Sequence, residues 1–268
     1  MLLALDIDNV QIGFGLFENI NEDNVSKSFK IATATNKTSD EYAVTIDAIF
    51  SRYSIDASAI NGVVISSVVP ALTEVLKDAV VRLTGDVNVL TVGKGIKTGF
   101  AIKIDNPSEL GTDLVANAAA VMSIKGKENK TGTSSVIIDM GTATTVFAIN
   151  ANGEYIGGSI LPGIGISFEV LHGKAAQLPV VTPAAPTNII GKNSSDSVRS
   201  GVIFGSAMMI DGFIDVFAEE MRTSKTDVYI TGEYARQVIP YCKHKMIRVD
   251  DLTLVGLACI YRNNFKLK

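Results

Sequence analysis

The feature that most constrains the fold is a short apolar stretch that ends in an aspartate and occurs twice. Residues 136–138 are apolar, Asp139 follows, and a glycine and several hydroxyl residues come next. Residues 2–5 are also apolar and are followed by Asp6 and a polar stretch. Each copy then returns to apolar residues, so each predicts a buried strand, a turn and a second strand.

Two such units about half a chain apart indicate an internal duplication. A carboxylate at the turn can face a metal ion. Gly141 lets a ligand approach the backbone, and the hydroxyls of Thr142 and Thr144 can donate to an oxyanion such as a phosphate. A single stretch of this kind is equally well explained as an ordinary strand and polar turn that bind no ligand. The repeat favours a nucleotide and metal site, with Asp6 and Asp139 on opposite walls of a cleft.

Composition narrows the class of protein. A chain of 268 residues suits two domains, and 47% hydrophobic residues can form sizeable cores. The net charge of −4 comes with no basic block, which argues against a nucleic-acid surface. Two isolated cysteines and two isolated histidines give no zinc pattern. The sequence has neither a signal-peptide pattern nor a long apolar run, so we expect a cytoplasmic protein that does not enter a membrane.

The remaining pattern alternates strands and helices, which indicates an α/β fold with mixed sheets. Thr38 and Glu41 predict the capped start of a helix. Further strands are expected at residues 28–32, 62–68 and 227–231. Helices are expected at residues 73–83, 115–122 and 252–261, and residues 196–217 are expected to form one long helix or two. The boundary between the duplicated halves is expected inside the small-residue helix, giving domains 1–117 and 118–268.

Three other stretches carry expectations. The glycine-dense residues 155–165 predict a turn, or backbone amides that approach an anion. Residues 178–193 contain three prolines and predict a surface loop. Gly201, Gly205 and Gly212 are expected to allow close contacts of the long helix with its neighbours.

The ordered motifs resemble those of the type III pantothenate kinases, a family within the actin-like ATPase and sugar-kinase superfamily. The resemblance runs nearly from end to end. Its matching stretches are residues 6–9, 38–42, 65–70, 106–107, 111–113, 139–145, 157–163, 190–193 and 251–257. Each stretch is weak alone, but their order and spacing are specific.

The resemblance implies two duplicated ribonuclease-H-like domains with a cleft between them. It implies ATP-dependent phosphorylation of pantothenate to 4′-phosphopantothenate, the first step towards coenzyme A. It also implies Mg²⁺, a monovalent cation (K⁺ or NH₄⁺) and a homodimer.

The resemblance further assigns roles to residues. Asp113 is the expected general base, and Asp139 and Asp6 are the expected metal ligands. The residues expected to bind ATP are Asp6, Ile7, Asp8, Asn9, Val10, Gln11, Ile12, Gly13 and Thr142. Those expected at the acceptor are Ile104, Gly111, Thr112, Asp113, Leu114 and Ser194. Local sequence alone also allows Asp113 to be a helix cap or a partner of the helix dipole.

Several of these positions depart from the family pattern. Asp8 replaces a glycine and adds a negative charge near the expected phosphates. Val10 replaces a hydroxyl residue. Leu114 replaces the arginine that would grip the carboxylate of pantothenate through a charge-assisted fork. Ile104 replaces a tyrosine, whereas Ser194 replaces a threonine and keeps its hydroxyl.

These changes predict weakened or redirected chemistry on an unchanged framework, and they leave two alternatives to a pantothenate kinase. One is a catalytically degenerate paralogue that acts as a regulatory or binding protein. The other is a kinase for another small hydroxylated acceptor that lacks a carboxylate.

Overall fold

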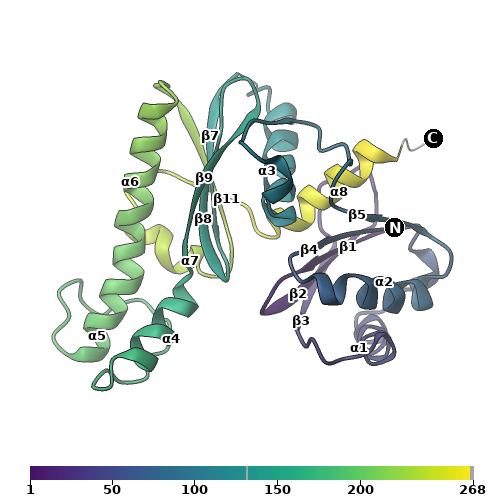
Figure 1. Ribbon diagram of the computed structural model, residues 1–268, viewed down its shortest axis with the longest axis horizontal. Coiled ribbons are helices and arrows are strands. Elements are labelled where there is room, and N and C mark those ends of the chain that lie inside the picture. The colour runs from purple at the N-terminus through teal and green to yellow at the C-terminus, as the bar shows by residue number, and fades with distance from the viewer. Residues whose placement is uncertain (131, 266–268) are drawn as a thin grey trace. The chain divides into compact units, whose positions relative to one another are not determined.

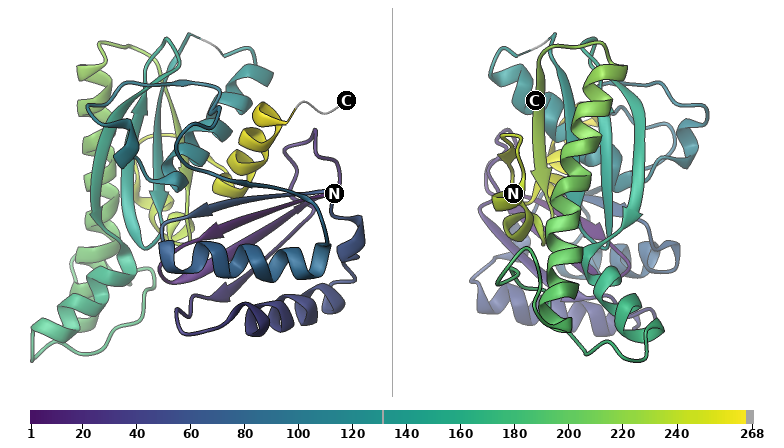
Figure 2. Two further views of the ribbon diagram at one scale, coloured as in Figure 1. Left: turned by 45° about the vertical axis from the view of Figure 1, so that its right-hand side comes forward. Right: turned by 90° about the vertical axis from the view of Figure 1, so that its left-hand side faces the viewer.

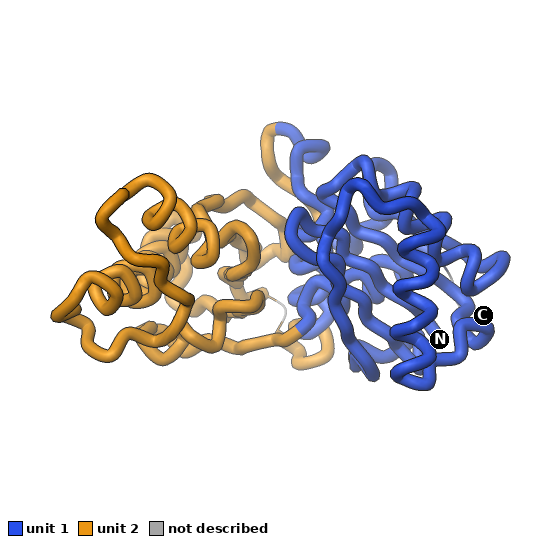
Figure 3. Tube along the Cα trace, turned by 90° about the horizontal axis from the view of Figure 1, so that it is seen from below, with its two compact units in different colours: residues 1–100, 106–124, 251–268 blue, residues 101–105, 125–250 orange. Residues whose placement is uncertain are grey.

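The computed structural model describes residues 1–130 and 132–265 and contains two compact units, coloured separately in Figure 3. Unit 1 comprises residues 1–100, residues 106–124 and the segment that begins at Asp251. Unit 2 comprises residues 101–105 and 125–250. The expected boundary between residues 117 and 118 refers to duplicated halves of the sequence and stays a prediction.

Unit 1 is built on a five-stranded sheet with the order β3-β2-β1-β4-β5 (Figure 1). The strands are β1 (Leu2–Ile7), β2 (Gln11–Phe17), β3 (Lys27–Ala32), β4 (Gly62–Ser67) and β5 (Asn88–Thr91). The first three form an antiparallel meander, whereas β4 pairs in parallel with β1 and β5 pairs in parallel with β4.

Unit 2 repeats this arrangement in a six-stranded sheet with the order β11-β10-β7-β8-β9-β6. The strands are β6 (Ala101–Ile102), β7 (Ser134–Met140), β8 (Ala143–Ile149), β9 (Glu154–Pro162), β10 (Thr226–Thr231) and β11 (Ile247–Arg248). Strands β7, β8 and β9 form an antiparallel meander. Strand β10 pairs in parallel with β7, and β11 pairs in parallel with β10. The common five-strand order confirms the predicted duplication.

Helices cover both faces of the sheet in unit 1. They are α1 (Ser39–Arg52), α2 (Pro70–Thr84), α3 (Thr112–Lys127, in unit 1 up to Ile124) and α8 (Leu252–Asn264), with 3₁₀ turns η1 (Ala57–Ala59) and η2 (Pro107–Glu109). Helices α1 and α2 pack apolar side chains against one face of the sheet, and α8 packs against the other (Figures 1 and 2). Helix α1 begins with the predicted capping box, in which Thr38 and Glu41 satisfy each other's backbone N–H groups.

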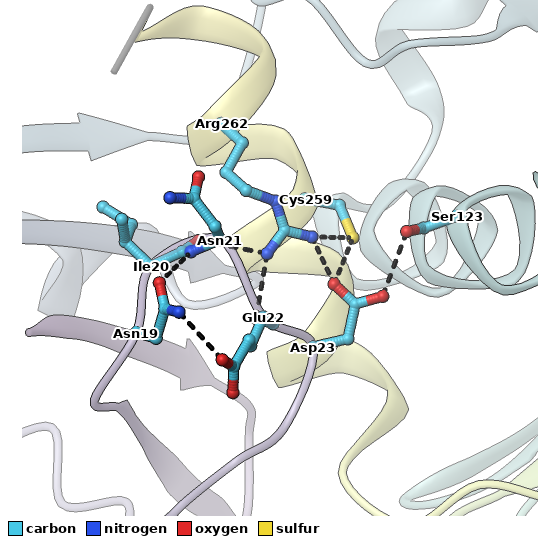
Figure 4. A network of polar contacts seen from close by, with 8 residues as sticks. All are labelled: Asn19, Ile20, Asn21, Glu22, Asp23, Ser123, Cys259 and Arg262. Atoms are coloured by element: carbon cyan, nitrogen blue, oxygen red, sulfur yellow. Dashed lines mark hydrogen bonds and ion pairs between the residues drawn. The ribbon is translucent and has the colours of Figure 1, made fainter. Parts of the chain in front are cut away.

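Helix α8 is fixed to unit 1 by close packing and by a polar network. A Cβ atom at Gly256 would lie 1.7 Å from the carbonyl oxygen of Ala116, so α8 and α3 are in backbone contact there. Arg262 donates to the carbonyl oxygens of Ile20 and Glu22 at 3.1 and 2.9 Å and pairs with Asp23 (Figure 4). These contacts tie the loop between β2 and β3 to the last helix of the chain.

The helices of unit 2 are α4 (Ile164–Lys174), α5 (Ser194–Arg199), α6 (Gly205–Glu220) and α7 (Ala235–Val238), with a π-helix, η3 (Ser200–Phe204), and a 3₁₀ turn, η4 (Ile239–Tyr241). α5, η3 and α6 form one continuous helical segment, Ser194–Glu220. Of the two expected alternatives, one long helix or two, the first is therefore correct. The segment's length of 27 residues and the mean hydropathy of 1.6 over an 18-residue window would also suit a membrane span, and 33% of that window is buried. A single helix of this kind is weak evidence for a membrane span, because helices of soluble proteins can have the same length and composition. Ile203, Ala207 and Ile210 on this segment lie in the core of unit 2.

The expected close contacts of three glycines in the long helix are wrong, and so is the turn that was one of two alternatives for residues 155–165. Gly201, Gly205 and Gly212 mediate no close contact, because a Cβ atom at any of them would have no atom within 4 Å. The glycine-dense stretch forms mainly the strand β9 instead of a turn. A Cβ atom at Gly158 would lie 2.3 Å from the carbonyl oxygen of Val146 on β8, so this glycine serves the close pairing of two strands.

Smaller differences concern helix starts. Helix α2 begins at Pro70 and not at Thr73, because proline is well suited to the first turn of a helix. Helix α3 begins at Thr112, so Asp113 and Leu114 lie inside its first turn and not in the preceding loop.

Candidate functional site

The first group of expected site residues lies at the turn between β1 and β2 in unit 1. Asp6 is in register with Gly13 on β2 and with Ser66 on β4. Asp8 donates its N–H to the carbonyl oxygen of Gln11 at 3.1 Å, and its carboxylate accepts the N–H of Asn9 at 2.7 Å. The Asp8 carboxylate therefore already occupies a backbone donor that a phosphate oxygen would otherwise use.

The apolar members of this turn have separate roles. The side chains of Ile7 and Ile12 are fully buried in the core of unit 1, so only their backbone can face a nucleotide. Val10 is 61% exposed at the tip of the turn. It offers no side-chain donor, as the sequence comparison with the family pattern already indicated.

The first turn of α3 supplies the second group of residues in unit 1. The hydroxyl of Thr112 lies 2.9 Å from the hydroxyl of Ser66 and accepts the N–H of Ser67 at 3.2 Å. Because β4 is the parallel neighbour of β1, the C-terminal ends of both strands lie side by side. These bonds therefore hold the start of α3 at the end of the sheet that carries the β1–β2 turn. A Cβ atom at Gly111 would lie 2.4 Å from Oδ1 of Asp113, so the glycine makes room for that carboxylate.

The environment of Asp113 distinguishes it from an ordinary capping aspartate. Burial raises the pKa of its carboxyl group above the usual value. Hydrogen bonds from the backbone N–H groups of Leu114 and Asp113 oppose that rise in pKa, and the negative charge of Asp8 adds to it. A carboxylate that only caps a helix in water would have a lowered pKa, so this one suits a general base.

Leu114 takes part in packing. Its side chain is only 8% exposed, so it is a member of the buried apolar set of unit 1. An arginine at this position would have to bring its charge out of that packed environment before it could hold a carboxylate.

In unit 2 the expected residues Asp139 and Thr142 lie at the turn between β7 and β8, which corresponds to the β1–β2 turn. Asp139 is in register with Thr145 on β8 and with Thr231 on β10. The Oγ1 atom of Thr145 is buried and has no hydrogen-bond partner among the described residues. The end of β7 therefore carries a carboxylate and a neighbouring hydroxyl that can accept further bonds.

Two glycines bring other backbone segments against this second turn. A Cβ atom at Gly163 would lie 2.1 Å from the carbonyl oxygen of Thr142. Gly232 has φ +95°, and a Cβ atom there would lie 2.5 Å from the backbone N of Met140. Neither position accepts a larger residue without a shift, so backbone segments pack directly against this turn.

Ile104 and Ser194 lie in other parts of unit 2. Ile104 follows β6 beside the backbone of Gly157, and its neighbour Lys103 forms an ion pair with Glu154 at 3.7 Å. Ser194 is the first residue of α5, where Asn193 caps the helix by accepting the N–H of Asp196. The ammonium group of Lys103 thus already pairs with a carboxylate of its own unit, that of Glu154.

The expected metal ligands are single carboxylates. Among the residues that the structure describes, no three His, Cys, Asp or Glu side chains form a metal-binding cluster. Mg²⁺ in nucleotide sites commonly takes one or two protein carboxylates and completes its shell with phosphate oxygens and water. Asp6 fits such a role, and Asp139 with the Thr145 hydroxyl offers the oxygen donors that a monovalent cation prefers.

Sequence reasoning missed several supporting residues. Ser66 and Ser67 hold Thr112, and Thr33 bonds to the β1–β2 turn, but none of them stands out as a chemical group in the sequence. Gly163 stood out only as a member of the glycine-dense stretch, and Gly232 only follows the expected strand at residues 227–231. Their function depends on backbone approach between segments far apart in the chain, which no local pattern encodes.

Comparison with known proteins adds an independent line of support. The sequence profile of the type III pantothenate kinase family matches residues 2–216. A type III pantothenate kinase from Thermobifida fusca (strain YX) is 35% identical over 266 residues, covering 98% of this chain and 100% of that protein. Another, from Geotalea daltonii (strain DSM 22248 / JCM 15807 / FRC-32), is 38% identical over 265 residues, covering 98% and 99%.

A solved structure supports the fold. The activator of the 2-hydroxyisocaproyl-CoA dehydratase from Clostridium difficile, with bound ADPNP, superposes with a TM-score of 0.51 at 13% identity. The match covers 97% of this chain and 93% of that one. At this identity the similarity concerns the two-sheet fold alone.

Proposed function

Because this chain belongs to the type III pantothenate kinase family, we propose that it transfers the γ-phosphoryl group of ATP to the 4′-hydroxyl of pantothenate. The reaction is a phosphoryl transfer to an alcohol, and it is the first step of coenzyme A biosynthesis. The observation that carries this proposal is the placement of Asp113. Its pKa is raised, and α3 holds it at the sheet edge that bears the β1–β2 turn.

Each expected site residue has a role in the proposed phosphoryl transfer. Asp113 accepts the proton of the attacking hydroxyl, a role that requires an acceptor within hydrogen-bond reach. The β1–β2 turn, from Asp6 to Gly13, receives the phosphates through its backbone, and Thr142 also contacts the nucleotide. Asp6 and Asp139 would hold Mg²⁺ and a monovalent cation, respectively. Bound cations neutralise part of the charge on the transferred phosphoryl group.

Acceptor binding involves the remaining expected residues. Gly111 and Thr112 shape the start of α3, and Ile104 and Ser194 are further residues at the acceptor. Leu114 offers an apolar surface where the family pattern has a cation. Since a lost charge-assisted hydrogen bond costs roughly 1.5–3 kcal/mol, the carboxylate of pantothenate is held weakly.

The buried Leu114 also favours a second candidate, a kinase whose small hydroxylated acceptor has no carboxylate. Pantothenate and its neutral amide separate the two candidates. A carboxylate-binding enzyme prefers pantothenate in kcat/KM, whereas the alternative acceptor class predicts equal or better use of the amide.

We further propose a homodimer in the cytoplasm, on the basis of family membership. Size-exclusion chromatography with light scattering measures the oligomeric state directly. A monomer at micromolar concentration would contradict this part of the proposal.

The main test is calorimetric titration with a non-hydrolysable ATP analogue and Mg²⁺, followed by pantothenate, alongside a coupled assay for ADP. We expect nucleotide binding and slow transfer with a high Michaelis constant for pantothenate. Tight nucleotide binding with no transfer to either acceptor would instead identify a regulatory paralogue. Absence of nucleotide binding would refute the proposal.

A further inference from the structure

The β1–β2 turn has a backbone conformation that is unusual for a two-residue hairpin loop. Asp8 and Gln11 face each other across a loop of two residues, Asn9 and Val10. Two-residue hairpin loops favour turns with a positive φ, because only these match the twist of the strands. Neither Asn9 nor Val10 has a positive φ. The turn therefore depends on support from outside the hairpin.

That support comes from Thr33, the residue that follows β3. Its hydroxyl donates to the carbonyl oxygen of Asp8 at 2.6 Å. Its backbone N–H donates to the carbonyl oxygen of Val10 at 3.0 Å. Thr33 thus fixes the carbonyl groups of Asp8 and Val10, which lie before and after Asn9 in the chain. It thereby also limits how the peptide group between Asn9 and Val10 can be oriented.

Thr33 is itself anchored through its neighbour. The phenol oxygen of Tyr42 accepts the N–H of Ala34 at 3.0 Å and donates to the carbonyl oxygen of the same residue at 2.9 Å. Tyr42 is fully buried in α1, whose first turn is closed by the capping box of Thr38 and Glu41. The backbone after β3 is therefore attached to the packed core of unit 1.

We propose that Thr33 is a positioning residue for the nucleotide, with Tyr42 as its anchor. Thr33 holds the β1–β2 turn in the conformation that receives the phosphates, so binding does not have to order a loose loop. Rigidifying a loop in its bound conformation improves affinity by removing the cost of ordering it. This inference rests on the proposed function, because it takes the turn to be the phosphate-binding element.

The test uses four variants of the full chain: two at Thr33, one at Tyr42 and one control. Thr33→Val keeps the shape of the side chain and removes its hydroxyl, whereas Thr33→Ser keeps the hydroxyl. Thr84→Val is the matched control, since the Thr84 hydroxyl in the last turn of α2 donates to the carbonyl oxygen of Val80, far from the β1–β2 hairpin in sequence. The measurements are the Kd for a non-hydrolysable ATP analogue with Mg²⁺, the KM values for ATP and acceptor, and amide exchange at Asn9 and Val10.

We expect Thr33→Val to raise the Kd and the KM for ATP about three- to tenfold, as loss of one hydrogen bond predicts. The KM for the acceptor should stay unchanged, and amide exchange at Asn9 and Val10 should accelerate. Thr33→Ser should restore the parent values. Tyr42→Phe should change the same quantities in the same direction, because it leaves the backbone of Ala34 without its anchor.

Two outcomes would overturn the inference. One is a parent that binds ATP and a Thr33→Val variant that binds it equally well. The other is an equal loss of ATP affinity in Thr84→Val, which would mean that the effect is general destabilisation. A parent that binds no nucleotide refutes the proposed function instead. In that case amide exchange in Thr33→Val still shows whether the hydroxyl holds the turn.

Discussion

Asp113 is subject to two opposing influences at the start of α3. Backbone N–H donors favour its ionised form, whereas burial and the charge of Asp8 favour the neutral form and raise its pKa on balance. A base with a raised pKa accepts a proton more readily. A structural cap would need only the donors.

We predict that Asp113→Asn lowers phosphoryl transfer by about 10²–10⁴-fold, the usual contribution of a general base. Asparagine caps a helix about as well as aspartate, so a capping role alone predicts nearly unchanged activity. A coupled ADP assay on purified parent and variant measures the difference. Full activity of the variant would remove Asp113 from the mechanism.

Stability should respond to pH with a definite sign. Because the native pKa of Asp113 is raised, its favourable contribution is complete below the pKa of an unfolded aspartate and is lost as pH rises through the native pKa. The neutral asparagine avoids that loss. Melting temperatures should therefore favour Asp113→Asn increasingly as pH rises, with little difference at low pH. The reverse trend would show that the carboxylate is stabilised in the native state.

Asp8 competes with the phosphates for the same turn. Its carboxylate accepts the N–H of Asn9 at 2.7 Å and adds a negative charge. We predict that Asp8→Gly tightens binding of the ATP analogue and makes binding less dependent on Mg²⁺. Asp8→Asn, which removes only the charge, should give part of the gain. Calorimetry at two Mg²⁺ concentrations tests this, with Asp47→Asn on the exposed side of α1 as the charge control. Unchanged binding in Asp8→Gly would show that the carboxylate points away from the phosphates, and weaker binding would identify Asp8 as a metal ligand.

At the scale of helices and strands, the sequence predicts those features that residues close together in the chain determine. The capping box of α1 depends on residues three apart, and both aspartate-bearing hairpins depend on short apolar runs, so all of these were predictable. The glycines of β9 were misinterpreted, because local sequence shows that a Cβ is missing but not which strand approaches the gap. Thr33 was missed for the same reason: its partner is 25 residues away.

Glycines in two helices give a matched prediction. Gly256→Ala would place a methyl group 1.7 Å from the carbonyl oxygen of Ala116, so α8 must move away from α3. We expect destabilisation of about 1–3 kcal/mol or more. Gly212→Ala in α6 meets no atom within 4 Å and should stabilise the protein by about 0.5–1 kcal/mol through helix propensity. Calorimetric melting compares the two. Equal effects would mean that the contact between α3 and α8 is not tight.

At the scale of the whole molecule, the two compact units do not follow the order of the sequence. Helix α8 lies at the end of the chain, yet it belongs to the unit that contains β1. It packs against β1, β2 and β4, and Arg262 ties it to the loop between β2 and β3. Unit 1 is therefore complete only when the last segment of the chain has been made.

This dependence predicts the result of a truncation. Six large side chains of α8 are buried: Leu252, Leu254, Val255, Leu257, Ile260 and Tyr261. At roughly 1.5–3 kcal/mol each, their loss is comparable to the roughly 5–15 kcal/mol by which native proteins are stable. We expect a chain that ends at Asp250 to lose amide protection in β1, β2 and β4, whereas β7 and β8 keep more of theirs. A chain that ends at Phe265 is the control and should match the parent. Hydrogen exchange resolved by peptide measures both units in one sample. Full protection of β1 in the chain that ends at Asp250 would show that unit 1 folds without its last helix.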